Sequence, residues 1–140
     1  LQVNLNAGLD SNSEIWENLL NQIQRTKRIK NLELYIDFNF DFLKKFSGNK
    51  QLLLVRIIQE FLNNSIKYSQ CSKIDLMAKK GDNEILIIQL KDDGVGFDNK
   101  KIISGEGLKS MNHRAQLLEA DIEIKSQTGL GTELNLTCKR

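Results

Sequence analysis

Three polar side chains recur at short intervals within a stretch of the chain that is otherwise mostly apolar. Glu60, Asn64 and Lys67 are four and three residues apart, and a rotation of about 100° per residue places them in a band about 60° wide on a helix. Glu60 and Lys67 are then separated by about 10 Å along the axis, a length comparable to a triphosphate with its metal. The line could bind a metal-nucleotide, although an exposed polar stripe on a surface helix gives the same pattern.

A carboxylate followed by glycines comes next along the chain. Asp92 is in phase with the apolar positions of a predicted strand, 84–91, so its side chain should point to the buried face of a sheet. A buried carboxylate requires hydrogen-bond donors, and the exocyclic amine of an adenine is a suitable one. Gly94 and Gly96 allow the backbone to approach a flat ring closely. Taken alone, an ordinary turn with an Asp-Gly step is the commoner structure.

Two further groups have residue types that suit a nucleotide. Gly105, Gly107 and Leu108 stand where a third helix should begin, and free backbone amides at a helix N-terminus form an anion site. The segment lacks the Gly-Lys-Ser/Thr sequence of a P-loop, and an ordinary glycine-rich loop is the alternative. Thr132 is in phase with the leucines of the last predicted strand, so its hydroxyl should point inward, either to a base edge or simply into the core.

The elements that must position these residues follow from apolar periodicity and turn residues. The predicted helices cover about 11–25, 51–68 and 107–118, and the predicted strands cover 32–38, 74–78, 84–91, 122–124 and 134–136. Hairpins rather than regular strand-helix alternation predict an α+β fold. We expect a two-layer sandwich in which three helices cover one face of a mixed, mostly antiparallel sheet of about five strands. The 140 residues suit a single domain, 1–140.

Composition excludes several classes of protein. Twenty Lys and Arg against eighteen Asp and Glu give a net charge of +2, and the basic residues are dispersed, so we expect no nucleic-acid partner. Two cysteines without a metal-binding or disulfide spacing indicate a reducing compartment, which predicts a cytoplasmic domain. No apolar run approaches the roughly 18 residues that cross a bilayer. Because the chain begins at Leu1, we expect a fragment of a longer protein, with any membrane anchor in the remainder.

The order and spacing of the four groups together resemble the ATPase superfamily of gyrase, the HSP90 chaperones, histidine kinases and MutL. Residues 59–69 look like the asparagine box of sensor histidine kinases, and residues 107–115 resemble the nitrate-sensor-like branch of those kinases. The resemblance covers about 51–137. It implies the Bergerat ATP-binding fold, with ATP and Mg²⁺ as cofactors.

The resemblance also implies a role for each residue at the phosphate end. Asn64 would ligate Mg²⁺, and Lys67 would neutralise phosphate charge. Glu60 would polarise the attacking imidazole or support the metal shell, so Glu60 and Lys67 are the catalytic candidates. A mobile lid and phosphate site would be lined by Gly105, Gly107 and Leu108.

At the adenine end, the resemblance implies that Asp92 reads the exocyclic amine with assistance from Thr132. Gly94 and Gly96 would form the floor of the pocket. His113 is the only histidine of the chain, and it stands on the third predicted helix, outside any acceptor motif, so it should be a surface residue.

The reaction implied is transfer of the γ-phosphoryl group of ATP to a histidine on a separate dimerisation domain of the same parent chain. The implied partners are that phosphoacceptor domain and a downstream response regulator, and the parent should be a homodimer. Two alternatives remain open on the sequence. One is a protein serine kinase like the anti-sigma-factor kinases, and the other is a nucleotide-binding or interaction module without phosphoryl transfer.

Overall fold

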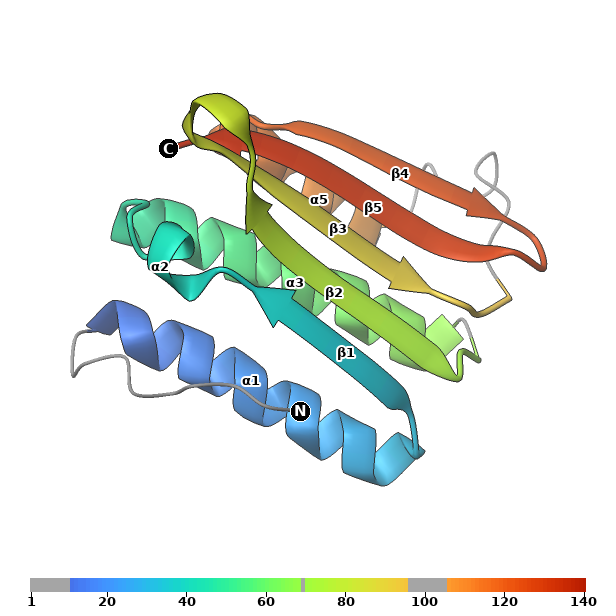
Figure 1. Ribbon diagram of the computed structural model, residues 1–140. Helices are drawn as coiled ribbons and strands as arrows, with labels where there is room; N and C mark the ends of the chain where they lie inside the picture. Colours follow the sequence, from blue (N-terminus) through green and yellow to red (C-terminus); the bar gives the residue numbers. More distant parts are fainter. Residues whose placement is uncertain (1–10, 69, 96–105) are drawn as a thin grey trace.

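A five-stranded sheet forms the frame of the molecule (Figure 1). The computed structural model describes residues 11–68, 70–95 and 106–140. The strands are β1 (Glu33–Phe38), β2 (Lys73–Lys80), β3 (Ile85–Asp92), β4 (Asp121–Gln127) and β5 (Gly131–Lys139). They lie in the order β1-β2-β3-β5-β4. Strands β1 and β2 are parallel and every other neighbouring pair is antiparallel, so the sheet is mixed and mostly antiparallel, as predicted.

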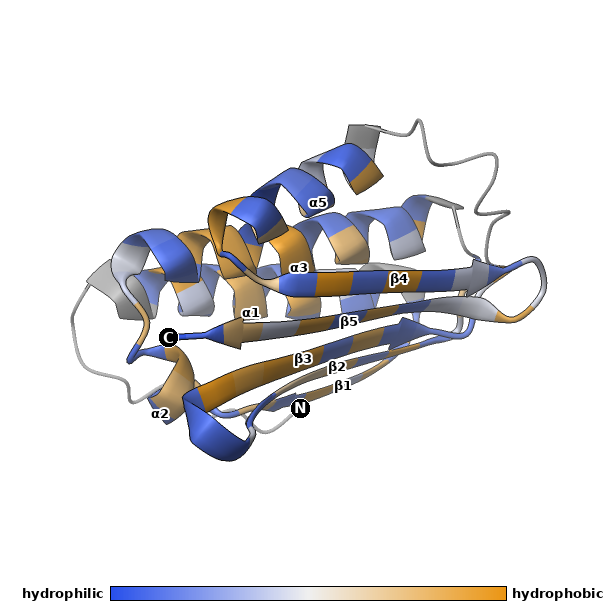
Figure 2. Cartoon of the chain, turned by 90° about the horizontal axis from the view of Figure 1, so that it is seen from above, coloured by the Kyte–Doolittle hydropathy of each residue, from blue (hydrophilic) through white to orange (hydrophobic). Residues whose placement is uncertain are grey.

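Three long helices lie on one face of this sheet (Figures 1 and 2). They are α1 (Ser11–Lys30), α3 (Gly48–Tyr68) and α5 (Glu106–Leu117). Helix α3 lies between the other two and packs against both. The predicted α+β sandwich is confirmed. Within the described residues, none of the helices combines the length and the apolar character that crossing a membrane requires.

The core lies between the sheet and the helices. Strand alternation directs every second side chain inward, and Leu86, Ile88 and Leu90 of β3 are accordingly buried. Helix α3 contributes its apolar stripe, which includes Ile58 and Leu62. Each such aliphatic side chain contributes about 1.5–3 kcal/mol on burial, so the packing of α3 on the sheet fixes the polar residues that α3 also carries.

A buried polar contact attaches α1 to the remainder of the fold. The indole nitrogen of Trp16 donates a hydrogen bond to Oε1 of Gln51 at 2.8 Å. Gln51 is completely buried, and its side-chain nitrogen Nε2 donates to the backbone carbonyl of Phe46 at 2.7 Å. Trp16 also makes edge-to-face contacts with Phe38 and Phe40.

The structure differs from the sequence prediction mainly at helix ends. Helix α3 begins three residues earlier than expected, at Gly48, because the hydroxyl of Ser47 accepts from the amide of Lys50 and caps the first turn. A short helix, α2 (Phe40–Leu43), was not predicted, and Asn39 caps it by accepting from the amide of Phe42. The turn between β2 and β3 contains a short 3₁₀ helix, η1 (Asp82–Glu84).

Candidate functional site

Asp92 stands at the end of β3 with its carboxylate on the helix-covered side of the sheet. Only 8% of the residue is exposed. Its Oδ1 atom accepts from the backbone amides of Gly94, at 3.0 Å, and Thr132, at 3.2 Å. Its Oδ2 atom accepts from the hydroxyl of Ser65 on α3 at 2.6 Å. The structure thus brings Asp92, Gly94 and Thr132 together, as the sequence analysis predicted.

Ser65 was not among the predicted site residues. It is 2% exposed, and its position on the apolar arc of α3 makes a small core residue the default interpretation from sequence. The sequence could have indicated a polar partner for Ser65, because Ser65 directly follows Asn64 and a buried hydroxyl requires a hydrogen-bond partner.

The hydroxyl of Thr132 contacts a second serine that sequence reasoning missed. Ser126 of β4 is the cross-strand partner of Thr132, and the two hydroxyl oxygens are 2.9 Å apart. Ser126 is 5% exposed and also lies 3.2 Å from the carbonyl oxygen of Gly131, to which its hydroxyl donates. This contact orients the Thr132 side chain beside Asp92.

Gly131 permits the close approach of β5 to the end of β3. Its φ is +87°, and a Cβ placed there would lie only 2.2 Å from the backbone oxygen of Asp92. The neighbouring turn also contacts the loop after β3, because the amide of Gly129 donates to the carbonyl of Val95. The backbone around Asp92 is therefore enclosed on the β5 side.

The polar stripe of α3 meets the N-terminus of α5. A Cβ placed on Gly107 would lie 2.6 Å from Oε1 of Glu60 and 3.1 Å from Nδ2 of Asn64, so these two side chains face the first turn of α5. Lys67 is exposed near the C-terminal end of α3, and Leu108 is half-buried and packs against the core. Backbone amides of a first helical turn lack intrahelical partners and attract anions.

Two of the predicted glycines, Gly96 and Gly105, lie outside the described residues. His113 is exposed on α5. Among the described residues, no group of three or more His, Cys, Asp or Glu side chains is arranged to hold a metal ion. Near Gly107, the oxygen atoms that could contribute to holding a metal are those of the Glu60 carboxylate and the Asn64 amide.

A hollow of about 410 Å³ opens at the ends of β3, β4 and β5 beside Asp92. It is lined by Lys91, Asp92, Lys125, Ser126, Gln127, Leu130, Gly131, Thr132 and Glu133. A larger hollow of about 740 Å³ is formed by β1, β2, β3 and Lys27, and it includes none of the predicted site residues. The smaller hollow includes Asp92 and Thr132, but the side chains of Lys91, Lys125 and Glu133 lie in the opposite strand phase, so this hollow also extends over the helix-free face of the sheet.

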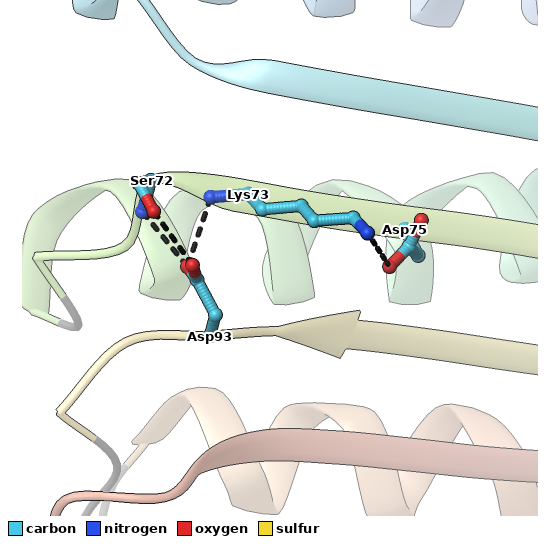
Figure 3. Close-up of polar contacts among 4 residues, drawn as sticks. All are labelled: Ser72, Lys73, Asp75 and Asp93. Atoms are coloured by element: carbon cyan, nitrogen blue, oxygen red, sulfur yellow. Dashed lines mark hydrogen bonds and ion pairs between the residues drawn. The ribbon is translucent and has the colours of Figure 1, made fainter.

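Asp93 holds the backbone next to Asp92 in place (Figure 3). Its carboxylate accepts from the amide and hydroxyl of Ser72, at 2.8 and 2.6 Å, and from the amide of Lys73 at 2.8 Å. The Ser72 hydroxyl is the main cause that lowers the pKa of Asp93, followed among the lowering causes by the two amides, while partial burial opposes them. These hydrogen bonds join the end of β3 to the start of β2. The ion pair of Lys73 with Asp75 in the same view is about half exposed at 3.9 Å and contributes little.

Comparison with known proteins gives consistent matches. The model of a family described as histidine kinase-, DNA gyrase B- and HSP90-like ATPases matches residues 49–140. The oxygen sensor histidine kinase NreB of Staphylococcus carnosus is 32% identical over 111 residues, which cover 76% of this chain and 31% of NreB. The sensor histidine kinase ComP of Bacillus subtilis is 35% identical over 98 residues, covering 68% of this chain and 13% of ComP. The chain thus spans less than a third of the length of these relatives.

Solved structures share the fold at low sequence identity. The histidine kinase domain of the blue-light activated kinase EL346 of Erythrobacter litoralis superimposes with a TM-score of 0.70 at 15% identity, over 89% of this chain and 60% of that chain. The histidine kinase AdeS of Acinetobacter baumannii gives a TM-score of 0.67 at 16% identity, over 99% of this chain and 69% of that chain.

Proposed function

We propose a phosphotransfer function for this chain, which belongs to the family of histidine kinase-, DNA gyrase B- and HSP90-like ATPases. The family binds ATP, and the named relatives support a kinase role. The finer proposal is that the chain binds Mg-ATP and donates its γ-phosphoryl group to a histidine on a dimerisation domain of a longer parent protein.

The buried carboxylate of Asp92 is the observation that carries this proposal. Three features favour an adenine there: the carboxylate accepts hydrogen bonds, it is shielded from water, and glycine backbone adjoins it. The exocyclic amine would donate to Asp92 while Thr132 contacts the base edge, directly or through a water. Gly94, with Gly96, would form the floor.

The phosphate end lies where α3 and α5 meet. The first turn of α5, including Gly107, would present backbone amides to the phosphates. Mg²⁺ prefers oxygen ligands and commonly binds through one or two protein groups plus phosphates. Asn64 would be its ligand and Glu60 would support it, which suits their common position against Gly107. The bound ion would supply positive charge against the phosphates, and Asn64 and Glu60 would hold it there.

The residues of this chain act on the reaction mainly by positioning and charge. A nitrogen of the acceptor imidazole forms a bond to the γ-phosphorus, and the bond from that phosphorus to the β–γ bridging oxygen breaks, which releases ADP. Lys67 would neutralise the charge that develops on the phosphates, and Glu60 would accept a hydrogen bond from the far N–H of the imidazole. His113 lies exposed on α5 and is not proposed as the acceptor.

The proposal extends to the context of the domain. Residues 1–140 would act as one catalytic domain on the cytoplasmic side, where ATP is available. The parent would dimerise, and a response regulator would receive the phosphoryl group from the acceptor histidine.

A calorimetric titration of the chain with a non-hydrolysable ATP analogue tests the binding part, with and without Mg²⁺ and with the GTP analogue as control. We expect saturable, adenine-selective binding that Mg²⁺ strengthens. Absence of binding at millimolar nucleotide would overturn the proposal. In the parent protein, the phosphoryl group should be acid-labile, as on histidine; an acid-stable phosphoserine would instead identify a serine kinase.

A further inference from the structure

Ser65 donates a hydrogen bond from its hydroxyl to Oδ2 of Asp92, and none of the predicted site residues makes this contact. We propose that Ser65 is a specificity-determining positioning residue, which selects purines with a 6-amino group by fixing the last acceptor position of the Asp92 carboxylate. This inference rests on the adenine-binding function proposed above and deepens it.

Few hydrogen-bond acceptor positions of the Asp92 carboxylate are left for a ligand. Its two oxygens offer about four acceptor positions. The amides of Gly94 and Thr132 occupy Oδ1, and the Ser65 hydroxyl occupies one position on Oδ2. With these three donors from the described residues in place, the acceptor position that remains is on Oδ2, the oxygen that Ser65 holds.

The carboxylate requires such a contact to keep its orientation. The terminal torsion of an aspartate is broad, so its own rotamer preference does not define where the oxygens point. Two backbone amides anchor Oδ1 from one side, and Ser65 anchors Oδ2 from the helix layer at 2.6 Å. Because Ser65 is 2% exposed and lies on the rigidly packed α3, this anchor is fixed relative to the sheet.

This arrangement distinguishes among substituents at the purine 6-position. An amino group donates to Oδ2 and completes the set. A 6-oxo group presents an acceptor to an acceptor and is repelled. A purine without a substituent neither gains the hydrogen bond nor meets the repulsion, and therefore its binding should not depend on Ser65.

The experiment compares two ligands that differ only at this position, ADP and purine riboside diphosphate, by calorimetry on the 140-residue chain. In the Ser65→Ala variant we expect ADP affinity to fall by about tenfold, because a carboxylate that is no longer oriented by Ser65 loses much of its hydrogen bond to the 6-amino group. Affinity for purine riboside diphosphate should change less than about twofold. A residue with a merely structural role would not change the ratio between the two ligands.

The matched control concerns Asp93, the carboxylate that directly follows Asp92 in the sequence. Ser72 donates to Asp93 at the same 2.6 Å, so Ser72→Ala removes an equivalent hydroxyl from the neighbouring carboxylate and should leave the ratio unchanged. Ser65→Cys, which preserves the volume with a weaker donor, should give an intermediate ratio and replaces Ser65→Ala if that variant does not fold.

Equal losses for both ligands in Ser65→Ala, or no loss for either, would overturn this inference alone, provided the wild-type chain binds ADP. Failure of the wild-type chain to bind either nucleotide would overturn the proposed function itself.

Discussion

Replacing a single carboxylate oxygen of Asp92 should have a large effect on ligand binding. Asp92→Asn replaces an acceptor oxygen by an NH₂ donor, which must then face either the amides of Gly94 and Thr132 or the amine of the base. We expect ADP affinity to weaken by about 1–3 kcal/mol, because a buried polar group loses its partner. Calorimetry measures the loss. Asp75→Asn, which lies on the outer face of β2, serves as control, and an unchanged affinity in Asp92→Asn would contradict the site assignment.

Asn64 should determine the response to metal. Asn64→Ala removes the amide oxygen that we propose as the Mg²⁺ ligand, and the side chain is half-buried at the α3–α5 contact rather than in the core. We expect the strengthening of nucleotide binding by Mg²⁺ to disappear while the unfolding temperature changes little. Asn63→Ala, which lies off the polar stripe, should retain the metal effect. A metal effect of wild-type size in Asn64→Ala would exclude it as the ligand.

Asp93 should make part of the stability depend on pH. Its pKa is lowered in the folded chain, chiefly by the Ser72 hydroxyl, so the folded state favours the charged form. The stabilisation is therefore complete above the ordinary pKa of an aspartate and is lost as the pH falls through the lower folded value. Because Asp93 is exposed and solvent screens its charge, Asp93→Asn should cost less than about 1 kcal/mol near neutral pH, and it should flatten the acid limb of a urea-unfolding series. An acid limb identical to that of the wild type would contradict this role.

The sequence predicted which side chains gather at the candidate site only where side-chain phase was informative. Asp92 and Thr132 follow strand alternation, so their inward orientation was predictable. Ser65 and Ser126 were missed because a buried serine resembles any small core residue until its partner is known. Those partners are 27 and 6 residues away and depend on packing and register.

At the scale of elements, two glycines near the β4–β5 turn separate two physical effects: Gly129 lies in the turn, and Gly131 is the first residue of β5. Both have positive φ, but a Cβ at Gly129 would meet nothing within 4 Å, whereas at Gly131 it would collide with the backbone of Asp92. Gly129→Ala should cost about 1–2 kcal/mol for the left-handed backbone alone. Gly131→Ala should cost at least about 2 kcal/mol more, because the β3–β5 pairing must shift. Urea unfolding compares them, and equal costs would contradict the close approach.

Element type was predictable where apolar periodicity was long. Helix α3 and the five strands follow from repeats of 3.6 and 2 residues. Helix α2 is four residues long, too short to show a period. Helix α1 continues to Lys30, about five residues past its expected end, because the apolar pattern fades before the helix does. The resemblance to sensor histidine kinases, predicted from motif order, is confirmed by the family match and the relatives.

For the whole molecule, the attachment of α1 predicts how the chain unfolds. The family match begins at residue 49, yet α1 shares the core through Trp16 and Gln51. Trp16→Phe removes the donor to Gln51 and should lower the free energy of unfolding by about 1–3 kcal/mol. Circular dichroism in urea measures this change. Tyr35→Phe, on an exposed ring, is the control.

The wild-type chain should unfold in one transition that the single tryptophan and circular dichroism report alike. Separate transitions for α1 and for the remainder would contradict a single domain.

The position of β4 at one edge of the sheet bears on how copies of the chain meet. An edge strand offers unpaired backbone groups to any other extended segment, which is a route to aggregation. The exposed side chains of β4 include Asp121, Glu123 and Lys125. A second chain that added a strand there would have to desolvate these charges. The same residues that keep the edge hydrated thus oppose the extension of one sheet into another at high protein concentration.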